Sequence, residues 1–395
     1  MITVDEARGK LKTNCEPLCD LTIKLHSALG MYLAHDLQSP IDHPCFDQTA
    51  VDGYALNLNQ GYTPNKTYSI IGEIKAGDAG NIEIKEGEAI RIFTGASVPK
   101  SADSVVMQEH IIKEGNQIKI QKEGILKGAN IRLKGEQLTK GSTALKKGTL
   151  LTAAGIGFLA SLGIQQVSVY QKPLVGIVVT GNEFAEGVNE LEEGKIFESN
   201  GQMLVSALHK IGINTCYQTC IDDIVSLEEM LIEKEKAADV LLITGGVSVG
   251  DYDFTIPVLE KMGFKTIFHK IKQKPGKPLY FGKKGNKVAF GLPGNPRSVM
   301  VCFYQYVYSY LNQLMGSNFP DLKSILLPLA NDYKRKADGK VHFLSASIVN
   351  NEANLLNKQA SHMLQSLALA DGFVISKEDN LFLKKGEPVN FHLIP

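Results

Sequence analysis

The sequence contains no tryptophan, few cysteines and no excess of charge of either sign. Its 42 Lys and Arg residues balance 42 Asp and Glu residues, so the net charge does not favour a nucleic-acid partner. No apolar run approaches the ~20 residues that span a bilayer. The opening MITVDEARGK lacks the basic start and apolar core of a signal peptide. We therefore expect a soluble, cytoplasmic protein that binds neither membranes nor nucleic acid.

The six cysteines include two CxxxC pairs, Cys15 with Cys19 and Cys216 with Cys220. This spacing leaves metal binding open. However, Cys216 and Cys220 lie in the strand-like segment INTCYQTCI, where positions of the same parity share one face of the strand. Because thiols stay reduced inside the cell, we interpret all six as ordinary reduced cysteines.

The chain is long enough for several domains of ordinary size. After position 44, short apolar runs alternate with glycine-containing turns, which predicts a β-rich domain. From position 172, apolar strands alternate with amphipathic helices, and after position 316 only short strand-like runs follow. We predict a discontinuous N-terminal mixed domain (1–44 and 139–171), a β-rich inserted domain (45–138), an α/β domain (172–316) and a small C-terminal β-barrel-like domain (317–395).

Continuous apolar runs in PLVGIVVTG and DVLLITGG indicate parallel strands that are covered on both faces. Their alternation with helices predicts a three-layer α/β domain. Ser199 or Asn200 is a candidate cap for one helix that Gly212 would end, and Asn295 followed by Pro296 begins a long one. The expected elements are helices at 4–14, 23–37, 152–162, 199–212, 224–237, 254–262 and 295–315, strands at 213–221 and 264–270, and a hairpin at 279–294.

The segment TGGVSVGDYD follows a buried strand at the edge where parallel sheets bind ligands. Gly245 and Gly246 let backbone amides approach an anion, and the hydroxyls of Thr244 and Ser248 add donors. An acid such as Asp253 beside a phosphate suggests a Mg²⁺ between them. A plain strand-to-helix turn capped by Asp253 is the alternative. The segment matches neither the P-loop nor the GxGxxG pattern.

Two further segments supply positive charge and backbone donors. In KPGKP, prolines and a glycine hold Lys274 and Lys277 in a rigid loop, which suits phosphate binding, although a solvated basic turn has the same composition. In GLPGNP, Gly294 and the helix start at Asn295 and Pro296 present amides to an anion. Together with TGGVSVGDYD, these segments indicate a phosphorylated or nucleotidyl ligand.

The remaining candidates are scattered. Glu183 lies just past a strand in VVTGNEF. In the β-rich region, Asp52 lies on the tight turn of DQTAVDGYAL, Thr94 follows a strand in RIFTGASVP, and Arg132 lies in GANIRLKGE. Each of these three is open to a simpler interpretation, since Asp and Thr also cap turns and an arginine also pairs with surface acids.

In this order, the segments resemble those of the molybdopterin molybdenumtransferase family, which includes the bacterial MoeA proteins and the gephyrin E domain. DQTAVDGYAL is similar to the family's SAMDGYA-type segment, RIFTGASVPKSADSVVMQE to its TGA segment and GANIRLKGE to its NIRxxGE segment. TGGVSVGDYD, KPGKP and GLPGNPRS carry the resemblance most specifically. It covers nearly the whole chain.

The resemblance implies an enzyme that takes adenylylated molybdopterin and molybdate, hydrolyses the adenylyl phosphoanhydride and inserts molybdenum at the dithiolene, with release of AMP and with Mg²⁺ assisting. It implies a homodimer whose site lies between the α/β, molybdopterin-binding domain of one subunit and the β-rich domain of the other. Molybdopterin adenylyltransferase and downstream molybdoenzyme maturation proteins are the implied partners.

The resemblance also implies roles for particular residues. Catalytic roles fall to Asp52, Thr94, Glu183 and Asp253, of which Glu183 and Asp253 would also bind Mg²⁺. The implied substrate-binding residues are Arg132, Asp223, Thr244, Gly245, Gly246, Ser248, Lys274, Lys277, Gly294, Asn295, Pro296 and Ser361.

Four positions depart from the family pattern. Gln137 stands where the family has an aspartate after GE, Asn182 changes TGDE to TGNE, Glu198 replaces an aspartate, and Ser345 stands where the last domain usually has an arginine. Two alternatives therefore stay open: a non-catalytic molybdopterin-binding scaffold, and a paralogue that prefers tungstate.

Overall fold

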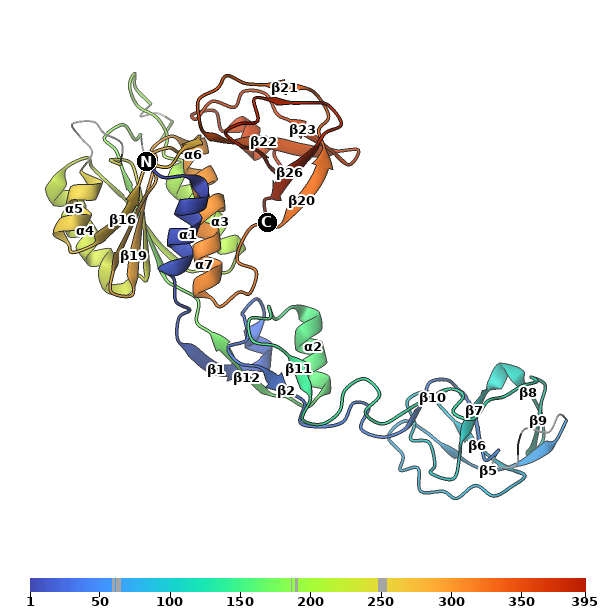
Figure 1. The fold of residues 1–395 in the computed structure, drawn as a ribbon. Coiled ribbons are helices and arrows are strands. Elements are labelled where there is room, and N and C mark those ends of the chain that lie inside the picture. Colours follow the sequence, from blue (N-terminus) through green and yellow to red (C-terminus); the bar gives the residue numbers. More distant parts are fainter. Residues whose placement is uncertain (59–60, 62–64, 186, 189–190, 248–253) are drawn as a thin grey trace. The chain divides into compact units, whose positions relative to one another are not determined.

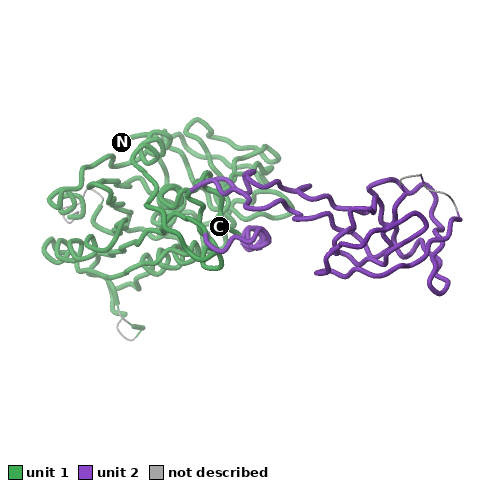
Figure 2. The backbone as a smooth tube through the Cα atoms, turned by 90° about the horizontal axis from the view of Figure 1, so that it is seen from below, with its two compact units in different colours: residues 1–34, 148–152, 167–395 green, residues 35–147, 153–166 purple. Residues whose placement is uncertain are grey.

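The computed structural model describes residues 1–58, 61, 65–185, 187–188, 191–247 and 254–395. The chain divides into two compact units, which Figure 2 shows in different colours. Unit 1 comprises residues 1–34, 148–152 and 167–395, and unit 2 comprises residues 35–147 and 153–166. The finer division into four domains stays a prediction.

A six-stranded sheet forms the centre of the larger lobe of unit 1 (Figure 1). Its strand order is β14 (Thr215–Cys220), β13 (Val175–Thr180), β15 (Val240–Thr244), β19 (Lys287–Leu292), β18 (Tyr280–Lys284) and β16 (Lys265–His269). The first four strands are parallel to one another, and β18 and β16 pair antiparallel. The expected strands and the hairpin are confirmed.

Helices cover both faces of this sheet, so the three-layer α/β class is confirmed (Figure 1). One face packs against α1 (Val4–Thr13), α3 (Asn200–Lys210), α6 (Pro296–Cys302) and α7 (Tyr308–Leu314), and the other against α4 (Ile224–Ala237) and α5 (Thr255–Lys261). Every residue of β13 and of β15 is buried. This burial on both faces is the physical reason for their unbroken apolar sequences.

Local signals set most helix ends. Thr3 and Glu6 form a reciprocal capping box at the start of α1. The long helix begins at Pro296 as expected, but the Asn295 side chain makes no capping hydrogen bond. That helix is also not uniform, because a π-helical segment, Phe303–Val307, separates α6 from α7. Such bulges insert one residue into the helical repeat, which apolar spacing alone does not reveal.

The remaining lobe of unit 1 is built from short strands, as expected for a small β domain. Its main sheet has the order β17 (Gln273–Lys274), β22 (Val341–Val349), β24 (Gly372–Ser376), β26 (Pro388–Leu393) and β20 (Ser324–Pro328), with β23 (Glu352–Leu355) beside β22. A second pair, β21 (Tyr333–Lys334) and β25 (Phe382–Leu383), and the short helix α8 (Gln365–Ala368) complete it. Strand β17 belongs to the KPGKP region, so this sheet incorporates a loop of the α/β domain.

Unit 2 is β-rich, as its glycine-punctuated sequence predicts. Its main sheet has the order β7 (Ser104–Met107), β4 (Gly53–Leu56), β6 (Glu88–Ile92), β5 (Thr67–Ile74), β9 (Gln117–Ile120) and β8 (Ile111–Glu114). Smaller elements are the 3₁₀ turn at Gln108–His110, the pairs β3 (Gln48–Thr49) with β10 (Ile131–Arg132) and β2 (Leu37–Gln38) with β11 (Thr143–Leu145), and helix α2 (Ala153–Ser161).

The helix expected at 23–37 is wrong. The chain instead forms β1 (Asp20–Lys24), which pairs with β12 (Gln166–Tyr170), and then a 3₁₀ turn at Leu25–Ala28. Pairing with a strand far along the chain outweighs the helix-like spacing, because tertiary contacts override local propensity.

All six cysteine thiols are free. Within the described ranges, no helix is long and apolar enough to cross a membrane.

Candidate active site

A cavity of about 1010 Å³ in unit 1 collects residues from distant parts of the sequence. Five predicted site residues line it: Lys274, Lys277, Gly294, Asn295 and Ser361. Pro296 is not among the lining residues but begins α6 directly after Asn295. The KPGKP and GLPGN segments are therefore parts of one surface, as the anion-site hypothesis requires.

The KPGKP loop is held from beneath by buried groups. The side-chain nitrogen Nε2 of Gln273 donates to the backbone carbonyls of Pro275, at 3.1 Å, and Gly276, at 3.0 Å. The Gln273 amide oxygen in turn accepts a hydrogen bond from the Tyr306 hydroxyl. Gly276 has a φ of +86°, and a Cβ there would lie 2.5 Å from the Cys302 sulfur. The loop is therefore rigid, and the exposed side chains of its two lysines extend from a fixed base.

The cavity is strongly basic, because six Lys and Arg residues and a single acid line it. Three of these cations lie in one segment that the sequence analysis did not select: Arg335, Lys336 and Lys340. Their signal was the cluster YKRKADGK, which is basic but carries no recognisable spacing. Such a surplus of positive charge attracts phosphate and other oxyanions.

The acid, Asp338, lies between two basic side chains. It pairs with Arg335 at 3.0 Å and accepts from His342 Nε2 at 3.0 Å. Because a carboxylate only accepts, Nε2 carries the proton. Burial lowers the pKa of His342 below its ordinary value, although Asp338 opposes this effect, so the imidazole is neutral at pH 7.

The carboxyl ends of two neighbouring strands meet beside the GLPGN loop. The Thr244 hydroxyl donates to the Pro293 carbonyl at 3.0 Å. The buried amide of Asn200 donates both to the Thr244 hydroxyl, at 3.1 Å, and to the Gly294 carbonyl, at 2.8 Å. The hydrogen bonds of Thr244 and Asn200 therefore fix the position of the GLPGN loop. The sequence alone did not assign Asn200 to the site.

The turn after β15 requires glycine. Gly245 has a φ of +97°, and a Cβ there would lie 2.4 Å from the Thr180 hydroxyl oxygen. Gly246, with a φ of +61°, leaves 2.8 Å for a Cβ beside the Thr255 hydroxyl. The chain therefore turns sharply at the sheet edge, as the glycine pattern predicts. Ser248 and Asp253, the next predicted residues, lie outside the described residues.

Two other predicted residues lie along the same edge of the sheet. Glu183 is exposed just beyond β13. Asp223 caps α4, accepting from the amides of Val225 and Ser226 at 3.0 Å each. A hydrogen bond with the Ser226 side chain, and then these two amides, lower the pKa of Asp223. Among the residues that the structure describes, no group of three or more His, Cys, Asp or Glu side chains could hold a metal ion.

Two of the departures from the family pattern make defined contacts near this edge. The Asn182 side-chain oxygen accepts from the Asp222 amide at 3.0 Å, which a carboxylate oxygen would do equally well. Glu198 accepts from the Gly201 amide and from the Tyr217 hydroxyl, each at 2.8 Å. Both substitutions keep acceptors where the backbone needs them.

In unit 2, Thr94 contacts Asp52, and Arg132 lies on a strand connected to the turn that follows Thr94. The Thr94 amide and hydroxyl both donate to Asp52 Oδ1, at 2.8 and 2.7 Å. These two hydrogen bonds lower the pKa of Asp52. Arg132 lies on β10, which pairs with β3, and β3 in turn hydrogen-bonds to the TGA turn that follows Thr94. The exposed Gln137 lies further along the same region.

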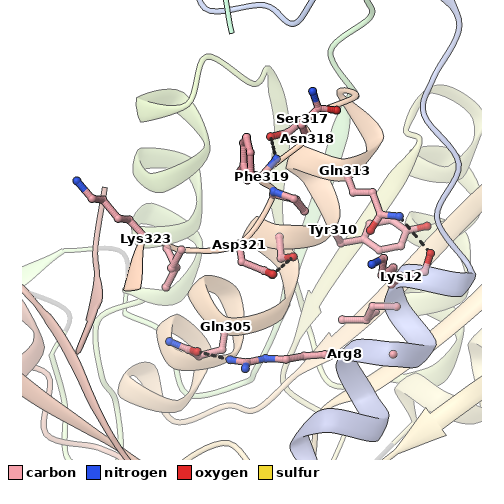
Figure 3. Close-up of a pocket in the computed structure, with 15 residues that line it drawn as sticks. Arg8, Lys12, Gln305, Tyr310, Gln313, Ser317, Asn318, Phe319, Asp321 and Lys323 are labelled. Carbon is pink, nitrogen blue, oxygen red and sulfur yellow. Dashed lines mark hydrogen bonds between the residues drawn. The ribbon is translucent and has the colours of Figure 1, made fainter. Parts of the chain in front are cut away.

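A second cavity of about 870 Å³ in unit 1 contains none of the predicted residues (Figure 3). It lies against α1 and α7, where Arg8 donates to the Gln305 amide oxygen at 2.8 Å (Figure 3). Ser309 donates to Asp321 at 2.6 Å. Its cations and acid are partly engaged in these contacts. The basic cavity is therefore the better candidate for the active site.

The fold and the basic cavity define a class of protein that comparison with known families identifies. Residues 2–163 match the MoeA N-terminal region (domain I and II), residues 176–313 a probable molybdopterin binding domain, and residues 327–394 the MoeA C-terminal region (domain IV). The resemblance drawn from the motifs is thereby confirmed: the chain belongs to the molybdopterin molybdenumtransferase (MoeA) family.

Individual relatives match over most of their length. The chain is 33% identical over 396 residues to the molybdopterin molybdenumtransferase of Haemophilus influenzae, covering 98% of each chain. It is 32% identical over 385 residues to that of a Nostoc species, covering 92% of this chain and 88% of the relative. A crystal structure of the molybdopterin biosynthesis MoeA protein from Pyrococcus horikoshii has a TM-score of 0.86 at 30% identity, covering all of both chains.

Proposed function

We propose that this protein is a molybdopterin molybdenumtransferase of molybdenum cofactor biosynthesis. It accepts adenylylated molybdopterin and molybdate. Water adds to the adenylyl phosphorus as the phosphoanhydride bond breaks, AMP leaves and the pterin keeps its own phosphate. The dithiolene sulfurs then bind molybdenum as one oxo ligand of molybdate leaves as water with the two thiol protons. The observation that carries this proposal is the basic cavity, which joins KPGKP and GLPGN in a chain whose relatives are named for this activity.

The cavity suits a substrate with several phosphate charges. Lys274 and Lys277 project from a loop whose backbone is held by hydrogen bonds, so little ordering of the loop backbone remains to oppose binding. The further cations of the 335–340 segment face the same space. Fixed positive groups of this kind stabilise the charge that develops on phosphate oxygens when the anhydride bond breaks.

We also propose that Mg²⁺ binds at Asp253 and Glu183. Carboxylate oxygens are the ligands that Mg²⁺ prefers, and it would neutralise phosphate charge when bound. The carboxylate of Glu183 by itself provides too few ligands to hold Mg²⁺, and the described residues contain no metal-binding cluster. The proposal therefore depends on Asp253. In Asp253→Asn, AMP release should fall far more than molybdopterin binding; an equal loss of both would leave a capping role.

We propose a cytoplasmic homodimer in which unit 2 of the partner completes the site. Asp52 and Thr94 are hydrogen-bonded to each other, and these bonds lower the pKa of Asp52, which keeps it ionised. Arg132 lies on β10 of the same unit. Molybdopterin adenylyltransferase would supply the substrate, and proteins that mature molybdoenzymes would receive the product.

The direct test is AMP release from adenylylated molybdopterin in the presence of Mg²⁺ and molybdate. The wild type should release AMP and form active cofactor, and Lys277→Ala should weaken substrate binding by about tenfold. Lys265→Ala is a matched control, because Lys265 is exposed on β16 and does not line the cavity.

Absence of AMP release, with an active homologue measured in parallel, would reject the proposal. Tight molybdopterin binding without release would instead support the scaffold. Competition between molybdate and tungstate in the same assay identifies the preferred oxyanion.

A further inference from the structure

Arg297, in the first turn of α6, is a buried cation whose contacts are all neutral. Only 2% of its surface is exposed, although it lines the basic cavity. Its Nε donates to the Ser345 hydroxyl at 3.2 Å, Nη2 donates to the Phe343 carbonyl at 2.9 Å, and both Nη1 and Nη2 donate to Gln359. No ion pair with an acid is formed within the described part of the chain.

A buried charge in this position is unfavourable unless an opposite charge offsets it. The neutral acceptors satisfy the hydrogen bonds of the guanidinium but leave its positive charge uncancelled, and burying an unpaired ion is strongly unfavourable. Burial lowers the pKa of Arg297 to about 10, so the guanidinium is still charged at pH 7. The counter-charge that would complete this arrangement is an anion in the cavity that Arg297 lines.

The same arginine fixes the shape of the cavity wall. Its backbone amide donates to the Ser361 carbonyl at 3.1 Å, and its Nη1 donates to the Gln359 carbonyl at 2.6 Å. The Gln359 side chain also exchanges hydrogen bonds with the Ser345 backbone, at 2.7 and 3.1 Å. Arg297 therefore ties the loop that carries Ser361 both to α6 and to β22.

Ser345 provides the space for this guanidinium. It is fully buried, and its small side chain ends at the Arg297 Nε. A long side chain at position 345 would enter the volume that the Arg297 side chain now occupies. The arginine that the family resemblance implies at 345 therefore has a counterpart here, reached from the helix instead of the strand.

We propose that Arg297 supplies the fixed charge and the positioning bonds of a tetrahedral-oxyanion subsite in this cavity, in place of an arginine at position 345. Of its five N–H donors, four bond to protein acceptors, and one hydrogen on Nη1 has no acceptor among the described residues. The oxyanion class rests on the proposed function, in which molybdate and the pterin phosphate are both tetrahedral oxyanions.

The test measures binding without turnover. Molybdate is titrated by calorimetry and molybdopterin by fluorescence, so a lack of AMP release by the wild type would reject the transferase without touching this result. Arg297→Ala should weaken at least one of the two ligands by about tenfold or more, since it removes charged hydrogen bonds. Lys66→Ala, which removes a surface ion pair with Glu86 and a cation–π contact with Tyr68 in unit 2, is the control and should change neither affinity.

An exchange of positions separates this role from simple packing. Ser345→Arg alone should lower stability in urea, because two guanidinium groups would share one buried space. Compared with Arg297→Ala, the double variant Arg297→Ala with Ser345→Arg should recover both stability and oxyanion affinity. The single variant Arg297→Met, which fills the volume without charge, should recover stability but not oxyanion affinity.

Each outcome decides the proposal. Loss confined to molybdate, or confined to molybdopterin, supports the subsite and identifies which oxyanion occupies it. A folded Arg297→Ala protein with both affinities unchanged overturns it, and so does a wild type that binds neither ligand. If Arg297→Ala does not fold, the double variant decides: binding supports the proposal, and failure to fold or to bind overturns it.

Discussion

Gly276 offers a direct test of whether the rigidity of the KPGKP loop depends on backbone geometry. In Gly276→Ala the new methyl group would lie 2.5 Å from the Cys302 sulfur and 2.9 Å from the Gln273 amide nitrogen. The residue also has a φ of +86°, which disfavours any side chain. Cys302 is completely buried and cannot move aside without disturbing the sheet-facing side of α6.

The expected loss of folding stability in Gly276→Ala is the sum of two contributions. A positive φ costs an L-residue ~1–2 kcal/mol. Overpacking a well-filled site adds ~1–3 kcal/mol. Gly285→Ala is a matched control, because Gly285 has a φ of +57° and nothing within 4 Å of its would-be Cβ. The two variants should therefore differ by the packing contribution of ~1–3 kcal/mol, to which the less favourable φ of Gly276 adds.

Urea unfolding measures the difference, and binding of molybdopterin measures its consequence for the loop. Adding Cys302→Ala to Gly276→Ala should recover ~1 kcal/mol relative to additivity, because the two side chains collide directly. Equal stabilities of Gly276→Ala and Gly285→Ala, or strict additivity in the double variant, would show that the loop yields and that our account of its rigidity is wrong.

Three further predictions concern other parts of the molecule. Mixing the Asp52→Ala and Lys277→Ala proteins should restore about a quarter of wild-type activity if each site draws on two subunits, since half of the randomly paired dimers carry one intact site; no recovery would place both residues in one subunit's site. Thr94→Val should raise the pKa of Asp52 toward 3.8 in a carbon NMR titration, whereas Thr94→Ser should not. Burial, and secondarily Arg8, lowers the pKa of His392 from 6.5 to about 4, so the unfolded chain binds the proton more tightly. Stability should therefore fall by at most about 3 kcal/mol between pH 6.5 and 4, and His392→Gln should flatten that slope in urea unfolding.

Sequence patterns were most informative where one physical requirement dominates. The unbroken apolar runs of β13 and β15 reflect burial on both sheet faces, and both strands form as expected. The glycines after β15 reflect a turn that admits no side chain, and the structure confirms that requirement at Gly245 and Gly246. Patterns failed where a distant partner decides, as at β1, whose residues look helical but pair with β12.

The candidate site shows the same division. KPGKP and GLPGNP could be selected because proline, glycine and lysine at fixed spacing restrict a loop by themselves. Asn200 and Arg297 could not, because an asparagine or arginine in a helix carries no local sign of what it will contact. Both became visible only through hydrogen bonds to residues far away in the sequence.

The amino-acid sequence by itself determined the family, the alternation of strands and helices, and two of the segments that line the basic cavity. These properties depend on local order and spacing, which a chain carries whether folded or not. Only the tertiary structure decided which charges share one cavity. It also decided that the Arg297 side chain on α6 contacts the Ser345 hydroxyl on β22. Burial and proximity are properties of the packed chain, and they determine where an unpaired charge remains to bind an anion.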